Sequence, residues 1–105
     1  MDAALKAIVE PRRREILRLV AHNELTAGEI AAHFEVTRPA VSQHLTVLKD
    51  AGLLAERREG TRRLYRARPE GLAQLKAYLA DFWDDRLDVL KQEAEQAERE
   101  RSERS

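Results

Sequence analysis

Short hydrogen-bonding side chains gather in the stretch TRPAVSQHLTVLKDAGLL, residues 37–54. Hydroxyl and amide groups of this kind both donate and accept hydrogen bonds, so they suit recognition of another polar surface. A catalytic interpretation fails, because Ser42 and His44 are two residues apart on a helix and do not face each other. No third partner, glycine-rich phosphate loop or paired-carboxylate signature accompanies them. The residues therefore predict a binding protein and not an enzyme.

The residues around these side chains have the pattern of one helix. Thr37 is suited to cap its start, and Pro39 lies in the first turn, where a missing N–H costs no hydrogen bond. Apolar residues recur every three or four positions from Val41 to Leu48, so at about 100° per residue they share one side. Gly52 is expected to end the helix in the left-handed conformation. The opposite side carries Pro39 and the hydrogen-bonding residues Ser42, Gln43, Thr46 and Asp50.

Three shorter helices are predicted before this one. DAALKAIVE forms a short helical piece, and Pro11 starts a second helix that runs to about His22. Thr26 and Glu29 have the T-x-x-E spacing of a capping box, which starts a third helix that reaches about Phe34. A short turn then joins the third helix to the polar-faced one, so the pair has the order of a helix-turn-helix.

Three consecutive arginines, Arg12, Arg13 and Arg14, fall in the first turn of the second helix. Cations at this end of a helix oppose its dipole, so their placement costs a little stability. We therefore expect these arginines to have partners, either acidic neighbours or phosphates.

A basic hairpin is predicted after the polar-faced helix, in LLAERREGTRRLYRA, where two short runs flank Glu59 and Gly60. The whole chain has no net charge, yet residues 36–68 hold eight basic and three acidic residues. This imbalance suggests an anionic partner, although a solvated surface would have the same composition. Leu54, Leu64 and Tyr65 are the expected anchors of the hairpin, and its arginines are Arg57, Arg58, Arg62, Arg63, Arg66 and Arg68.

The last helix is predicted to start at Pro69 and to carry apolar residues at spacings of three and four to about Ala97. This stripe is longer than a small body can cover, so a partner helix is expected. The domain prediction is therefore one domain over residues 1–97 that includes the dimerisation helix, and a polar, disordered tail over residues 98–105. The expected dimer interface comprises Leu5, Ile8, Leu79, Phe82, Trp83, Leu87 and Leu90.

Two helices joined by a tight turn and followed by a basic hairpin predict a winged helix-turn-helix, a mainly α fold with a small β-hairpin wing. Major-groove base edges present donors, acceptors and the thymine methyl, which the polar face can contact. Arginines of the hairpin would hold phosphates, and one near the tip could enter the minor groove. The predicted DNA-binding residues are Thr37, Arg38, Pro39, Ser42, Gln43, Thr46, Arg58, Arg62 and Arg63.

The segments EPRRREILRLV, LTAGEIAAHFEVTRPAVSQHLTVLKDAGLL and REGTRRLYRA resemble the ArsR family of bacterial winged-helix repressors, over roughly residues 3–90. The resemblance implies a homodimer that binds an inverted-repeat operator in double-stranded DNA and blocks the promoter. It also implies base-reading roles for Arg38, Ser42, Gln43 and Thr46, and a wing-tip role for Arg62. The alternative is a winged-helix module for protein interaction, or an architectural DNA binder that does not read sequence.

The sequence departs from metal-sensing members of that family, which use cysteines near the recognition helix or histidines along the last helix. The chain has no cysteine, and its last helix has no histidine. LAQLKAYLADFWDDRLDVLK instead resembles the metal-independent, SdpR-like branch, for which the inducing signal stays open. We expect neither a cofactor nor a metal site.

Several other features have plain structural interpretations. His44 is expected to make a structural hydrogen bond rather than a phosphate contact, and Phe82 with Trp83 to form dimer core rather than a ligand pocket. His22 and His33 are expected at the surface. The sequence has neither a membrane-span nor a signal-peptide pattern, which predicts a cytoplasmic protein. A solvated face is preferred over a cation site for Asp81, Asp84, Asp85 and Asp88.

Overall fold

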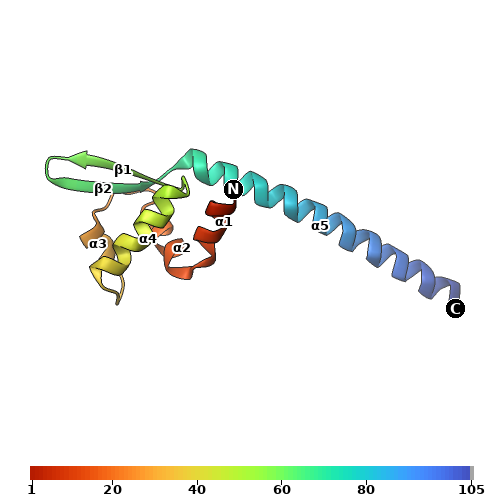
Figure 1. The fold of residues 1–105 in the computed structure, drawn as a ribbon. Helices are drawn as coiled ribbons and strands as arrows, with labels where there is room; N and C mark the ends of the chain where they lie inside the picture. Colours follow the sequence, from red (N-terminus) through yellow and green to blue (C-terminus); the bar gives the residue numbers. More distant parts are fainter. Residues whose placement is uncertain (105) are drawn as a thin grey trace. The chain divides into compact units, whose positions relative to one another are not determined.

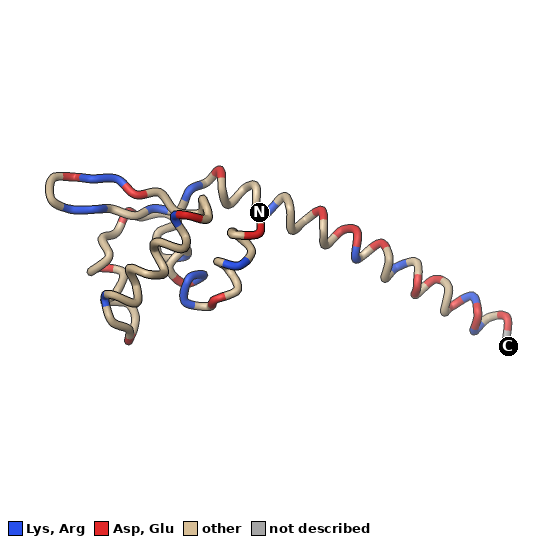
Figure 2. The backbone as a smooth tube through the Cα atoms, in the orientation of Figure 1, with Lys and Arg blue, Asp and Glu red and all other residues tan. Residues whose placement is uncertain are grey.

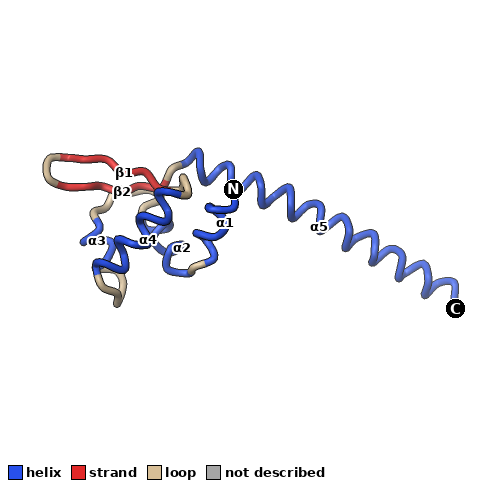
Figure 3. Tube along the Cα trace, viewed as in Figure 1, coloured by secondary structure: helices blue, strands red, loops and turns tan. Residues whose placement is uncertain are grey.

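The computed structural model describes residues 1–104, and its elements follow the order that the sequence predicts (Figure 1). Contacts divide the chain into two compact units, one of residues 1–75 and one that begins at Lys76. The mainly helical class with one antiparallel hairpin is confirmed (Figure 3). The elements are α1 (Asp2–Val9), α2 (Pro11–Leu19), α3 (Ala27–Ala31), α4 (Arg38–Asp50), β1 (Leu54–Glu59), β2 (Arg62–Ala67) and α5 (Pro69–Arg104).

The first unit buries one apolar core that α1, α2, α3, α4 and the hairpin share. Helix α4 supplies the residues that its pattern predicted to face inward, and the start of α5 adds Leu75. Thr37 caps α4 as expected, because its Oγ1 accepts a hydrogen bond from the Ala40 N–H at 3.3 Å. Gly52 ends the helix with a φ of 78°, and the following Leu53 N–H donates to the Leu48 carbonyl at 3.0 Å. These bonds fix both ends of α4.

Helix α3 begins where the capping box predicted. The Glu29 N–H donates to Thr26 Oγ1, and the Thr26 N–H donates to Glu29 Oε1, each at 3.1 Å. The helix ends at Ala31, earlier than the predicted Phe34, because the next N–H groups bond three residues back and tighten the chain into turns. Phe34 still packs against the core from this turn.

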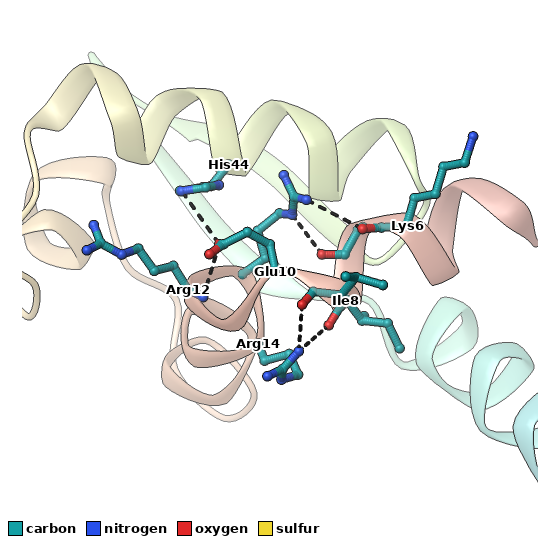
Figure 4. A network of polar contacts seen from close by, with 9 residues as sticks. Lys6, Ile8, Glu10, Arg12, Arg14 and His44 are labelled. Atoms are coloured by element: carbon teal, nitrogen blue, oxygen red, sulfur yellow. Dashed lines mark hydrogen bonds and ion pairs between the residues drawn. The ribbon is translucent and has the colours of Figure 1, made fainter.

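Two of the three arginines at the start of α2 have partners that the sequence did not indicate. Arg13 Nε donates to the Ala7 carbonyl at 2.7 Å, and an Arg14 guanidinium nitrogen donates to the carbonyls of Ile8 and Val9 at 2.6 and 3.0 Å (Figure 4). These carbonyls end α1 and would otherwise lack donors. Both side chains are therefore C-terminal caps of α1, a correction to the expected acidic or phosphate partners. Helix α2 ends at Leu19, before the predicted His22.

The hairpin pairs its strands in one antiparallel register, with Leu54 opposite Ala67 and Glu59 opposite Arg62. Gly60 takes a φ of 62° in the turn, as the sequence predicted. Two backbone hydrogen bonds connect the hairpin to the body. The Tyr65 N–H donates to the Leu25 carbonyl at 2.8 Å, and the Leu25 N–H donates to the Tyr65 carbonyl at 3.1 Å. The hairpin is thus fixed beside α3.

Helix α5 starts at Pro69 and places its first turns in the core of the first unit. Gly71 is required there, since a Cβ on it would lie 1.9 Å from the Gly52 carbonyl oxygen. The helix continues to Arg104, beyond the predicted end near Ala97, because residues 98–104 contain good helix formers and no glycine or proline. Gln96 supports this part by donating to Glu100 at 3.3 Å. No helix within residues 1–104 is long and apolar enough to cross a membrane.

Candidate nucleic-acid interface

The predicted outward face of α4 lies at the surface. Ser42, Gln43 and Thr46 are exposed, and so are Arg38 and Pro39 at the start of the helix. Thr46 Oγ1 donates to the Ser42 carbonyl one turn earlier at 3.0 Å, so its proton is already used within the helix. Thr46 therefore offers a methyl group and an acceptor, whereas the amide of Gln43 can donate and accept.

A groove separates this face of α4 from the hairpin. Ser42 stands at its edge on α4, and the hairpin contributes the residues just after its turn. Three guanidinium groups border the groove, and most of the remaining lining is polar. Such a border attracts an anionic ligand. The lining comprises Thr26, Ala27, Glu29, Arg38, Ser42, Thr61, Arg62, Arg63 and Tyr65.

Carboxylates outside the hairpin hold its arginines in place. Arg62 lies 3.8 Å from Glu29, the carboxylate that also closes the α3 capping box. The backbone N–H and the hydroxyl of Thr26, with the charge of Arg62, keep the pKa of Glu29 below its ordinary value. This carboxylate thus stays ionised under ordinary conditions and connects the hairpin to the start of α3.

Two further carboxylates hold the hairpin in place, Glu24 from outside it and Glu56 from within β1. Glu24 approaches Arg57 Nε at 2.5 Å and raises the pKa of that guanidinium, with a smaller effect from Glu59. Glu56 lies 3.1 Å from Lys49 of α4 and 3.6 Å from Arg63 of the facing strand. The carboxylates that anchor the wing were not recognised in the sequence, because Glu24 and Arg57 are 33 positions apart.

The tip of the hairpin concentrates positive charge. Arg58 and Arg63 lie directly opposite each other in the strand register, where like charges repel (Figure 2). Among the residues that the structure describes, Arg58 and Arg66 have no carboxylate partner. Like charges opposed in this way lower the stability of the free hairpin.

His44 occupies the edge between the outward face of α4 and the core. Its Nε2 lies 3.8 Å from an oxygen of Glu10, which caps α2 by accepting the Arg12 N–H at 3.0 Å (Figure 4). The distance is that of an ion pair if the imidazole is protonated, and it is too long for the structural hydrogen bond that the sequence suggested. The contact nevertheless joins α4 to the start of α2.

All nine predicted DNA-binding residues are exposed and belong to the first unit. The predicted interface residues differ among themselves, since Leu5 and Ile8 pack partly against the core of this unit. The other five belong to α5 and are 39–60% exposed: Leu79, Phe82, Trp83, Leu87 and Leu90. In residues 1–104 no group of three His, Cys, Asp or Glu side chains is arranged to hold a metal ion.

Comparisons with known proteins agree with this geometry. Residues 10–56 match the bacterial regulatory proteins of the arsR family. The HTH-type transcriptional regulator Rv2034 of Mycobacterium tuberculosis is 49% identical over 82 residues, which cover 78% of this chain and 77% of that protein. The transcriptional repressor SdpR of Bacillus subtilis is 43% identical over 60 residues, which cover 57% of this chain and 67% of the repressor.

A solved structure supports the same assignment. The homodimeric winged helix-turn-helix DNA-binding domain of Mb0332 from Mycobacterium bovis, a possible ArsR-family regulator, is 36% identical and superposes with a TM-score of 0.65. The match covers 80% of this chain and 78% of that domain. Taken with the capped helix pair and its adjoining basic hairpin, these similarities show that the chain belongs to the ArsR family of DNA-binding transcriptional regulators.

Proposed function

We propose that the protein is a homodimeric transcriptional repressor that reads an inverted-repeat operator with α4 of each protomer. The observation that carries this proposal is the exposed polar face of α4, which stands beside a groove bordered by arginines. Short uncharged donors and acceptors suit base edges, while cations beside them suit phosphates. A protein-interaction surface would not need this division between the two kinds of side chain.

In the proposed complex, α4 lies in the major groove. Gln43 reads an adenine through two hydrogen bonds, and Ser42 contacts a base or a phosphate. Thr46 presents its methyl group to a thymine, since its hydroxyl proton is used within the helix. Arg38, Arg62 and Arg63 hold the sugar-phosphate backbone, and Arg58 near the hairpin tip enters the adjacent minor groove. Thr37 and Pro39 start the helix close to the DNA backbone.

The homodimer is proposed from α5 and from the Mb0332 domain, which is itself homodimeric. Exposed large apolar residues on α5 gain stability when a second copy covers them. Two copies related by a twofold axis place two α4 helices on a palindromic site. The proposed interface keeps the predicted set of Leu5, Ile8, Leu79, Phe82, Trp83, Leu87 and Leu90.

Release of the proposed repressor does not use thiolate chemistry. The chain has no cysteine, so a soft metal ion cannot be held by thiolates. Its three histidines, His22, His33 and His44, lie on different segments of the first unit. Repression, as opposed to activation, is supported by the similarity to the repressor SdpR.

Selection from random duplexes at moderate salt tests the proposal directly. We expect the bound sequences to share an inverted repeat with half-sites about one helical turn apart, because a twofold dimer presents two reading helices. A promoter that carries the selected site should then lose transcription when the protein is present. Bound sequences without any common motif would overturn the proposal and favour an architectural DNA binder.

A further inference from the structure

Three arginines lie in the first turn of α2, and two of them make contacts within the fold. Arg13 and Arg14 cap the carbonyls that end α1. Arg12 is exposed, and within residues 1–104 its guanidinium has neither an ion-pair nor a hydrogen-bond partner (Figure 4). A cation in the first turn of a helix opposes the dipole, so Arg12 carries a small cost that the described fold does not offset.

The neighbouring Glu10 does not neutralise this guanidinium. One of its carboxylate oxygens accepts the backbone N–H of Arg12 at 3.0 Å and faces His44 at 3.8 Å. The N–H groups of Arg13 and Arg14 already donate to the Glu10 carbonyl. The start of α2 therefore offers an anion only the side chain of Arg12, and not free backbone donors.

Position on the helix directs Arg12 toward the DNA-reading helix. Residues four apart share a helix face, and Ile16, four positions later, is 1% exposed in the core that it shares with Val41 and Leu45 of α4. Arg12 thus lies on the same face of α2 as Ile16, one turn closer to the start of the helix. The contact between Glu10 and His44 fixes the same end of α2 against α4.

A hollow borders α4 on the α2 side, and the residue that follows Arg12 in the sequence lines it. This residue, Arg13, lines the hollow together with Ser42, Gln43, His44, Thr46 and Val47. Ser42 also lines the groove on the hairpin side, so it lies between the two depressions. A helix in the major groove has a phosphate backbone on each side. The hairpin supplies cations for one backbone, which leaves the other to the α2 side.

We propose that Arg12 binds a DNA phosphate on the wall of the major groove opposite the one that the hairpin contacts. This inference rests on the proposed insertion of α4 into the major groove. The contact carries no sequence information, because phosphates are the same at every base pair. It fixes the rotation of α4 about its own axis, since the helix is then held from both flanks.

The proposed contact between Arg12 and a phosphate is tested by the salt dependence of DNA binding. The test variant is Arg12→Gln, and Arg18→Gln is the matched control. Arg18 lies in the last turn of α2 and is paired with Glu15, so its removal subtracts the same charge from the other end of the same helix. Affinities for the selected duplex and for a random duplex are measured between 50 and 200 mM salt. The slope of log K against log salt is negative, and each lost phosphate contact should reduce its magnitude by about 0.9, or by about 1.8 for a dimer.

We expect Arg12→Gln to reduce the magnitude of this slope by the same amount on both duplexes. Arg18→Gln and Arg12→Lys should each leave the slope at the wild-type value. The melting temperature of Arg12→Gln should not fall, because no described contact is lost. An unchanged slope for Arg12→Gln, or an equal loss for Arg18→Gln, would overturn the contact but leave the proposed function standing. Wild-type protein without salt-dependent affinity for any duplex would overturn both.

Discussion

The two compact units of the chain differ in the burial of their apolar side chains. In residues 1–75, the core positions Ile30, Leu48 and Leu53 are fully buried. Residues 76–103 are all exposed, and Phe82 and Trp83 keep 52% and 60% of their surface accessible. Both units have helical apolar spacing, but only the first contains enough elements to cover it.

This difference shows where each unit obtains its stability. The first unit closes its own core and fixes α4 and the hairpin with caps and ion pairs, so the proposed DNA-binding face is formed within one chain. In the proposed dimer, the stripe on α5 should gain most from a second copy, because large exposed apolar patches are unfavourable in water. Reading and dimerisation are thus expected to respond separately to substitution.

The largest effect should follow from breaking the proposed dimer. Leu87→Glu or Leu90→Glu places a charge in the covered stripe, so the protein should become monomeric by light scattering. Affinity for the selected inverted repeat should fall by about 10²–10⁴-fold, because two linked half-site contacts become one. A variant that stays dimeric would contradict the position of the interface on α5.

Truncation of a buried leucine and of an exposed leucine should affect stability differently, and the effect should be smaller than that of breaking the dimer. In the Leu87→Glu background, Leu48→Ala should lower the free energy of unfolding by about 2–5 kcal/mol, since it empties a fully buried site. The matched truncation Leu90→Ala, at a residue 55% exposed, should change that energy by less than about 0.5 kcal/mol. Urea denaturation measures both, and equal losses would contradict the division between a closed core and an uncovered stripe.

Much of the fold could be predicted from local signals. Thr26 with Glu29, Thr37 and Gly52 are cap residues whose effect depends on near neighbours, and the structure places each as the sequence indicated. Helix ends without such a signal were less predictable. Helix α3 stops at Ala31 because its last bonds tighten into turns, and α5 passes beyond Ala97 because nothing in the polar segment ends it.

The contacts that position the candidate site were beyond sequence reasoning. Pairs such as Glu24 with Arg57 join residues that only the folded chain brings together. The capping of α1 by Arg14 depends on the angle between two helices, which no residue pattern specifies. The outward face of α4 was predictable, since it follows from helix periodicity alone. The roles of its members on DNA stay predictions.

The most direct test of the account compares the selected operator with random DNA for wild type and Gln43→Ala. We expect the variant to lose about 1–3 kcal/mol of discrimination per half-site, because a bidentate base contact disappears. Its affinity for random DNA should stay the same, since Gln43 carries no charge to hold a phosphate. An unchanged ratio between the two affinities would contradict the claim that the exposed face of α4 reads the bases.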